Sequence, residues 1–211
     1  IANLTLLPPI SGPDRHAAVR GWDCGPANSL LDLAAQHFSG GALSFDASGA
    51  WAAQGQVQER LIERWLQEPY FHQRPPKSTG RELFGSNDLE RRLAEIQALA
   101  PQSRPADALA TLTAFSAAVV AQDLALGPPP LELLVAGGGA RNRLLMAELV
   151  RRCRGLAVRP LAELGIADDQ REALAFALLA WWQQRRQRGS LPSVTGAPKA
   201  SRLGILAPVP G

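Results

Sequence analysis

The chain has 211 residues, of which 46% are hydrophobic and 19% charged, and this composition excludes an intrinsically disordered chain. The net charge of +3 comes without a basic run interleaved with aromatic residues, which argues against nucleic-acid binding. The longest apolar segment, residues 173–182, is about half of the ~18 residues that a membrane-spanning helix needs. In chain order, residues 1–7 are rich in β-forming residues and predict a strand.

Strand, turn and helix patterns alternate along the rest of the chain. A second strand is predicted over residues 17–22, and Pro26 suits the first turn of a helix over 29–37. Further helices are predicted over 56–67, 89–98, 106–124, 142–152 and 168–186, and further strands over 131–136 and 156–158. The pattern predicts an α/β fold.

Two regions near the C-terminus carry separate expectations. The helix over 168–186 is apolar all round between residues 173 and 182, so we expect it at the centre of the fold. Asp168 and Asp169 stand at its N-terminus, as the helix dipole prefers. Residues 191–211 are rich in proline and glycine, and we expect this tail to pack over the surface of the domain.

Asp23 is the first candidate functional residue, because it lies between a predicted strand and a helix start with Gly25 and Asn28 beside it. A carboxylate in this position can act as a base or hold a metal-bound phosphate. The alternative is that Asp23 only caps the helix.

The second candidate is the glycine turn of residues 137–142, which follows a predicted buried strand. Glycine lets a ligand approach the backbone closely, and the helix start beyond it attracts anions. The turn matches neither a GxGxxG nor a Walker A pattern, and a plain tight turn is the alternative.

Two further polar groups are candidates. Residues 77–82 carry many hydrogen-bond donors suited to a polyhydroxyl or carboxylate ligand, the alternative being a solvated loop that caps the next helix. Glu172 borders the most apolar helix, although helix starts favour acids in any case. The three histidines have no metal-ligand spacing, so no metal site is predicted.

Taken in order, several motifs resemble the anhydro-N-acetylmuramic acid kinases of bacteria over essentially the whole chain. The matching segments read WDCGPANSLLD (22–32), PYF (69–71), PPKSTGRE (75–82), GGGARN (137–142), EALAFA (172–177) and LPSVTGA (191–197). Asp46 and the segment GAWAAQG (49–55) also resemble a family stretch.

The resemblance implies an actin-like, ribonuclease H-like sugar-kinase fold with extra helices. The implied reaction opens 1,6-anhydro-N-acetylmuramic acid with water and phosphorylates it with ATP and Mg²⁺, in the cytoplasm, for cell-wall recycling. Asp23 would be the base that activates the water. The sugar would contact Glu172, Lys77, Ser78, Thr79 and Arg81. The nucleotide would contact Gly25, Asn28, Gly137, Gly138, Gly139, Ala140 and Asn142.

The chain departs from the family pattern in several ways. Cys24 and Ala27 stand where Thr and Gly are usual; the first change is expected to remove a hydroxyl near phosphate, and the second to crowd the backbone. The family's N-terminal phosphate loop has no counterpart here, and the chain starts without Met or a leader. We therefore expect residues 1–211 to be a C-terminal domain truncated at its N-terminus.

As a domain of that kind, the chain is expected to be a poor kinase alone. Its expected partners are the sugar, ATP and the N-terminal half of the kinase, and homodimerisation is possible by resemblance. Two alternatives stay open: a non-catalytic sugar-binding or interaction remnant of the fold, and another ATPase of the same superfamily. The two cysteines are too few for a disulfide framework, which suits a reducing compartment.

Overall fold

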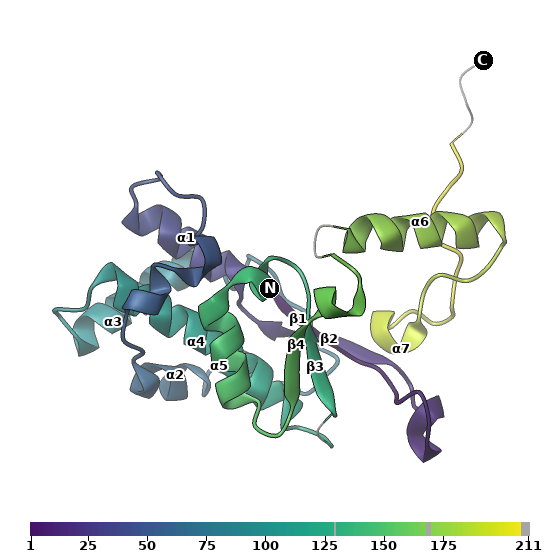
Figure 1. The fold of residues 1–211 in the computed structure, drawn as a ribbon, viewed down its shortest axis with the longest axis horizontal. Coiled ribbons are helices and arrows are strands. Elements are labelled where there is room, and N and C mark those ends of the chain that lie inside the picture. The colour runs from purple at the N-terminus through teal and green to yellow at the C-terminus, as the bar shows by residue number, and fades with distance from the viewer. Residues whose placement is uncertain (129, 168–169, 208–211) are drawn as a thin grey trace.

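A computed structural model describes residues 1–128, 130–167 and 170–207 of the chain. The helices and strands, in chain order, are β1 (Ala2–Leu6), β2 (Arg20–Gly25), α1 (Asn28–Phe38), α2 (Glu59–Trp65), α3 (Ser86–Leu99), α4 (Pro105–Leu124), β3 (Glu132–Val135), α5 (Arg143–Arg152), β4 (Ala157–Pro160), α6 (Arg171–Gln184) and α7 (Pro192–Thr195). Figure 1 shows helices α1–α5 gathered on one side of the strands, with α6 and α7 on the other. The predicted mixed α/β class is confirmed.

The strands form two separate pairs. β1 and β2 are antiparallel, with Asn3 opposite Asp23 and a register shift between Ala2 and Asn3. β3 and β4 are parallel, and α5 provides the crossover that parallel strands require. The strand predicted over residues 131–136 was expected to be fully buried, but β3 is exposed or half-buried along its length. The prediction was wrong because β3 has one neighbouring strand among the described residues, β4.

Helix α4 forms the centre of the core, and sixteen of its twenty residues are buried. Pro105 occupies its first turn, and Asp107 accepts a hydrogen bond from the Arg104 backbone in a capping box. Its buried hydroxyl groups donate to carbonyl oxygens one turn back, as Thr111 does to Asp107 and Ser116 does to Leu112. Hydroxyl groups are therefore satisfied inside an otherwise apolar helix.

An aromatic cluster connects α4 to the end of β2. Phe71 stacks on Phe84 with ring centroids 5.7 Å apart and meets Phe115 of α4 edge-on at 5.4 Å. Tyr70 also contacts Phe84, at 5.4 Å. Such ring pairs add to the stability gained by burying apolar surface. Here they pack beneath the end of β2.

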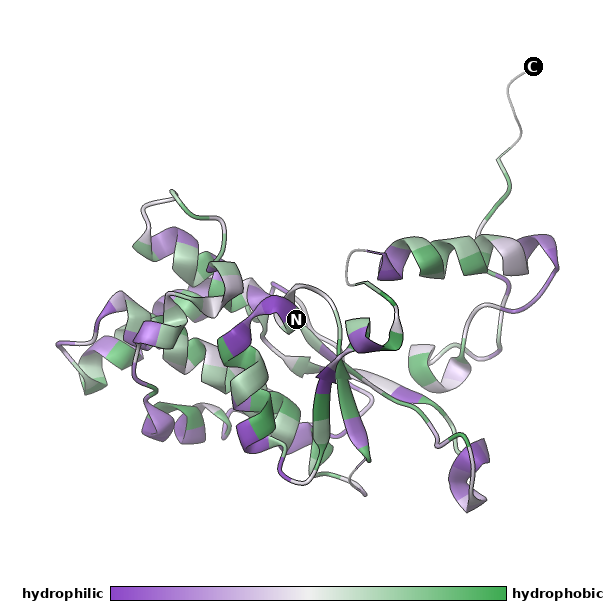
Figure 2. Cartoon of the chain, viewed as in Figure 1, coloured by the Kyte–Doolittle hydropathy of each residue, from purple (hydrophilic) through white to green (hydrophobic). Residues whose placement is uncertain are grey.

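The expectation that the helix over 168–186 is central was wrong. Helix α6 contains no buried residue, and Phe176 is 71% exposed. Figure 2 shows apolar residues along α6 where the helix lies apart from α1–α5. An apolar pattern on all sides shows that a helix favours burial, but α4 already fills the core of the described residues. Asp168 and Asp169 lie outside the described residues.

In the described part of the tail, α7 packs against β2. The side chain of Val194, in α7, lies 3.0 Å from the position that a Cβ would occupy at Gly21 of β2. Beyond α7, Ser201 accepts backbone hydrogen bonds from Gly189 and Ser190. Residues 202–207 are exposed. In the described parts of the chain, no helix has the length and apolar character needed to cross a membrane.

Candidate functional site

The side chain of Asp23 is held by three hydrogen bonds at the edge of the β1–β2 pair. Oδ1 accepts from Asn3 Nδ2 at 2.8 Å, and Oδ2 accepts from Ser78 Oγ and the Thr79 backbone N–H at 3.0 Å each. Because the first turn of α1 has Ala27 at its N-cap and no side-chain capping bond, the alternative that Asp23 caps this helix is wrong. The carboxylate is instead fixed between β1 and the 77–79 segment.

The backbone of Asp23 is fixed as firmly as its side chain. Its N–H donates to the carbonyl oxygen of Lys77 at 3.1 Å, and its carbonyl oxygen accepts from the hydroxyl of Tyr70 at 2.8 Å. Burial and the nearby carboxylate of Asp23 raise the pKa of Tyr70, so this hydroxyl keeps its proton and stays a donor. A side chain on such a backbone holds one orientation.

The environment of Asp23 keeps the carboxylate ionised. Partial burial raises its pKa, but the hydrogen bonds from Asn3, Thr79 and Ser78 lower the pKa by more, so the net shift is downward. A carboxylate has about four acceptor sites, of which these donors occupy three. Asp23 is half-buried and can therefore accept one further hydrogen bond from a water or a ligand.

The 77–82 segment lies beside Asp23 and does not cap the following helix. Helix α3 has Gly85 at its N-cap and no side-chain capping bond, so the capping alternative for this loop is also wrong. Ser78 is exposed and Thr79 half-buried, and the buried Thr79 Oγ1 has no hydrogen-bond partner among the described residues. This hydroxyl is therefore available to a water or a ligand that binds beside Asp23.

Lys77 differs from its neighbours, because its ammonium group points into the interior. Its side chain is 1% exposed, and Nζ lies 3.0 Å from Oδ1 of Asp123. The ammonium also lies 5.0 Å from the ring centre of Tyr70. A direct sugar contact by Lys77 would require this buried ion pair to open, so in this structure Lys77 is an interior residue.

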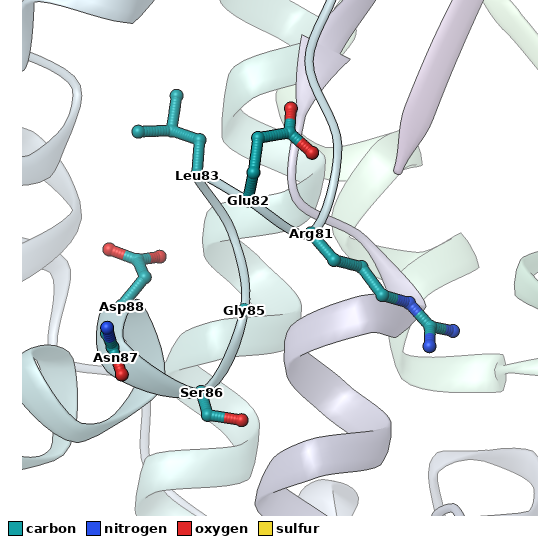
Figure 3. Close-up of a pocket in the computed structure, with 7 residues that line it drawn as sticks. All are labelled: Arg81, Glu82, Leu83, Gly85, Ser86, Asn87 and Asp88. Atoms are coloured by element: carbon teal, nitrogen blue, oxygen red, sulfur yellow. The ribbon is translucent and has the colours of Figure 1, made fainter.

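A small pocket lies where the 77–82 segment runs into α3. Its lining includes Arg81, Glu82 and Asp88, and Figure 3 shows the side chains of Arg81 and Glu82 leading away from each other. With a volume of about 190 Å³, the pocket is smaller than the ~300–1,000 Å³ typical of small-molecule sites. Arg81 is exposed and is therefore accessible to a larger ligand from outside this pocket.

The glycine turn lies against the start of α1. Gly137 has a φ of +80°, and a short helix over Gly138–Arg141 follows it. A Cβ placed on Gly138 would lie 3.2 Å from Nδ2 of Asn28. Two predicted nucleotide-binding segments, distant in sequence, are therefore neighbours.

Asn142 ends the glycine turn and begins the next helix. Its Oδ1 accepts a hydrogen bond from the Leu145 N–H at 3.0 Å as the N-cap of α5. The same oxygen would be only 2.1 Å from a Cβ at Gly49. The segment is thus a tight turn, as the alternative proposed, and the nucleotide role remains a prediction.

Two predicted residues at the end of β2 face inward. A Cβ at Gly25 would lie 2.8 Å from the Phe71 ring, so glycine is required here by packing. Cys24 is fully buried, and burial and the Asp123 charge raise the pKa of its thiol. The expectation that Cys24 removes a hydroxyl near phosphate is therefore not supported, because position 24 faces the core.

Glu172 is not among the hydrogen-bond partners of Asp23 in the described residues. It lies in the first turn of α6 with 81% of its side chain exposed, 3.9 Å from Arg171. The predictions also missed Asn3, Tyr70 and Asp123. The antiparallel register of two predicted strands was the available signal for Asn3, and an acid in the last turn of an apolar helix was the signal for Asp123.

Comparison with known proteins gives a consistent picture. Residues 1–209 match the family model described as anhydro-N-acetylmuramic acid kinase. A protein of that name from Synechococcus sp. (strain WH7803) is 61% identical over 210 residues, which is 97% of this chain and 53% of the relative. One from Prochlorococcus marinus (strain MIT 9303) is 57% identical over 212 residues, covering 98% of this chain and 55% of the relative. The chain spans about half the length of the curated relatives it matches.

Proposed function

The chain belongs to the anhydro-N-acetylmuramic acid kinase family, and we propose that it carries the water-activating carboxylate of such a kinase. The proposed reaction converts 1,6-anhydro-N-acetylmuramic acid, water and ATP to N-acetylmuramic acid 6-phosphate and ADP. The observation that carries this proposal is the ionised, half-buried carboxylate of Asp23, fixed by three hydrogen bonds from Asn3, Ser78 and Thr79.

In the proposed mechanism, Asp23 acts on a water at the anomeric carbon. The carboxylate accepts a proton from that water while the water oxygen bonds to the anomeric carbon and the bridge from that carbon to O6 breaks. O6, which keeps the electron pair of the broken bridge, then bonds to the γ-phosphorus of ATP as the bond from that phosphorus to ADP breaks, and Asp23 later releases its proton to solvent. A base contributes about 10²–10⁴-fold to such a step, and its rigid support keeps it within hydrogen-bond reach of the water.

We propose that the sugar binds over the 78–81 segment. Ser78 and Thr79 already contact Asp23, and the orphaned Oγ1 of Thr79 is suited to a sugar hydroxyl. Arg81 is exposed and cationic, so it suits the carboxylate of a muramic acid. Glu172 remains a proposed sugar ligand that requires α6 to approach this surface.

We propose that ATP binds along the glycine turn and the start of α1. The support is the contact between Gly138 and Asn28 and the positive φ of Gly137. The proposed ligands are Gly25, Asn28, Gly137, Gly138, Gly139, Ala140 and Asn142. Gly25 acts there through packing. Phosphoryl transfer asks mainly for positioning and charge neutralisation.

Mg²⁺ is proposed as the partner of ATP rather than as a resident ion. Among the described residues, no group of three or more histidine, cysteine, aspartate or glutamate side chains is placed to hold a metal. Mg²⁺ in kinase sites is commonly held by one or two carboxylates together with substrate phosphates. The described residues therefore do not form a metal cage of their own, and no step here depends on one.

We further propose that residues 1–211 act as the C-terminal domain of an actin-like, two-domain sugar kinase in the cytoplasm. The proposed partners are the N-terminal half of the enzyme and, from the resemblance, a second copy of the chain in a homodimer. Support comes from the length of the relatives and from the exposed apolar side chains of α6, such as Phe176 and Trp181.

The test is coupled ADP release with the anhydro-sugar and ATP. The chain is assayed alone and after addition of the half of the Synechococcus sp. (strain WH7803) kinase that it does not match. We expect very slow turnover alone, and sugar-dependent turnover when both parts are present. Turnover by the chain alone at ordinary sugar-kinase rates would contradict the need for a partner. ATP hydrolysis that ignores the sugar would overturn the proposed substrate and favour another ATPase activity.

Calorimetry separates the catalytic proposal from a binding remnant. The anhydro-sugar is titrated into the chain with and without its partner half, and with and without ATP. Sugar binding that is never followed by turnover would favour a non-catalytic sugar-binding protein, since the half-length match to the relatives is compatible with either.

A further inference from the structure

Beneath Asp23 lies a buried polar cluster that the predicted mechanism does not use. The carboxylate of Asp123, near the end of α4, accepts hydrogen bonds from Trp22 Nε1 at 2.8 Å and Lys77 Nζ at 3.0 Å, while burial and the Asp123 charge raise the pKa of the Cys24 thiol. The side chains of Lys77 and Asp123 are 1% and 2% exposed. We call these four residues the Asp123 cluster.

The cluster holds the chain on both sides of Asp23. Side chains alternate between the two faces of a strand, so Trp22 and Cys24 point inward to Asp123 while Asp23 points outward. Lys77 is bound to the same carboxylate and uses its own carbonyl oxygen to accept the Asp23 N–H. The two residues after Lys77 are the donors to Oδ2 of Asp23.

The geometry assigns a function to this arrangement. We propose that the buried Lys77–Asp123 ion pair is a positioning device, which sets the 77–79 segment so that Ser78 and Thr79 orient the Asp23 carboxylate. The consequence for catalysis rests on the proposed function above, but the positioning itself is a property of this chain.

Energetics favours positioning over a mainly stabilising role. A buried ion pair loses so much hydration that well-packed apolar residues of the same volume often stabilise a protein equally well. The pair instead holds the 77–79 segment against the end of α4, although the two are far apart in the sequence. Its ammonium also faces the ring of Tyr70, whose hydroxyl holds the Asp23 carbonyl oxygen.

The test is the titration of Asp23 in the isolated chain, followed by the ¹³C shift of its carboxyl group and the amide proton shift of Thr79. The variant is Lys77→Met with Asp123→Asn. It removes one positive and one negative charge together, so the direct charge effects on Asp23 largely cancel. The amide oxygen introduced at position 123 still accepts from Trp22, and the methionine introduced at position 77 keeps much of the length of the stem and can pack on Tyr70.

We expect the wild-type carboxyl to titrate below the ordinary aspartate value of about 3.9, and the double variant to titrate close to that value. The Thr79 amide proton should then cease to follow the titration. A folded double variant in which Asp23 titrates as in the wild type would overturn the proposal. The single variants Lys77→Met and Asp123→Asn each leave one charge unpaired in the interior and are expected to unfold more easily.

A matched control separates positioning from general loosening. Leu61 is 1% exposed and lies in α2, a helix that contains none of the four residues of the Asp123 cluster, and Leu61→Ala leaves a cavity in the core. It should lower stability while leaving the Asp23 titration unchanged. An equal rise in the Asp23 pKa in Leu61→Ala would show that any destabilisation has this effect, and would refute a specific positioning role.

A kinetic measurement on the reconstituted kinase keeps the two proposals distinguishable. The double variant should lower kcat by as much as about 10²-fold, as misplacement of a catalytic group by about 1 Å can do, with little change in the KM for ATP. If no kinase activity exists but the Asp23 titration shifts as expected, the proposed function fails and the positioning proposal stands.

Discussion

Replacing Asp23 by asparagine separates the chemical role of this residue from its structural role. The new side chain can turn its Oδ1 toward Ser78 and Thr79, leaving its amide group to face Asn3, whose own amide can turn over to accept. All three contacts in the wild type can therefore persist as neutral hydrogen bonds. We expect a folded variant with nearly the same geometry.

The stability cost follows from the loss of charge on these bonds. A hydrogen bond to a charged group contributes about 1.5–3 kcal/mol and a neutral one about 0.5–1.5 kcal/mol, and the half-buried position of Asp23 leaves part of that difference screened by solvent. We therefore expect Asp23→Asn to lower the free energy of unfolding by about 1–2 kcal/mol at pH 7. Urea unfolding followed by tryptophan fluorescence measures this change.

The pH dependence provides a second check. The folded-state pKa of Asp23 is lowered, so its contribution is fully present above the unfolded value of about 3.9 and is lost as pH falls through the folded pKa. Wild type and Asp23→Asn should therefore converge in stability on acidification below about pH 4. A stability difference that stays constant from neutral pH to well below the unfolded value would show that the hydrogen-bond argument is wrong.

Activity should respond far more strongly than stability. In the reconstituted kinase, Asp23→Asn should reduce kcat by about 10²–10⁴-fold, the range expected for loss of a general base. An unchanged rate in the folded variant would refute the assignment of Asp23 as the base, whatever the effect on unfolding.

Three further changes test other parts of the structure. The Arg104 guanidinium and two backbone N–H groups hold the pKa of Asp107 at about 2. Asp107→Asn should therefore lower the free energy of unfolding by about 2 kcal/mol at neutral pH, and this difference should disappear as the pH falls from about 4 to about 2. A difference between the two proteins that does not change with pH would contradict this prediction. Gly25→Ala brings a Cβ within 2.8 Å of the Phe71 ring, and thermal unfolding should reveal a loss of about 1–3 kcal/mol, whereas full stability would mean that the ring is free to move. Phe176→Asp should change the unfolding free energy by less than about 0.5 kcal/mol but reduce self-association in light scattering; a large loss of stability would show that α6 is buried.

The sequence predicts local structure well where one pattern dominates. The alternating start of the chain predicts β1, and the proline-flanked apolar segment predicts α4 to within one residue at its start. The donor-rich motif makes Ser78 and Thr79 candidates for ligand contact. Their contact with Asp23 could not be predicted, because it depends on the packing of a loop against a strand end that lies 55 positions from Ser78 in the sequence.

Two features required the three-dimensional structure. Lys77 belongs to the same donor-rich motif as Ser78, but the buried carboxylate of Asp123 draws its side chain inward, and no local pattern distinguishes the two directions. The apolar pattern of α6 indicates a helix that favours burial, but it does not identify the surface that covers it. A local sequence pattern shows whether a segment favours burial, but the surface or side chain that it packs against depends on contacts between segments that are distant in the sequence.

The alternation of buried and half-buried side chains from Trp22 to Cys24 makes the length of β2 as important as its composition. The side chain of Asp23 lies on the outer face of β2, whereas its neighbours Trp22 and Cys24 are buried in the core. Inserting or deleting a single residue upstream in this strand would move the acid into the core and carry an indole or a thiol to the surface. Natural variation at this strand should therefore occur by replacement of side chains, and changes in chain length should be confined to the loop that joins β1 to β2.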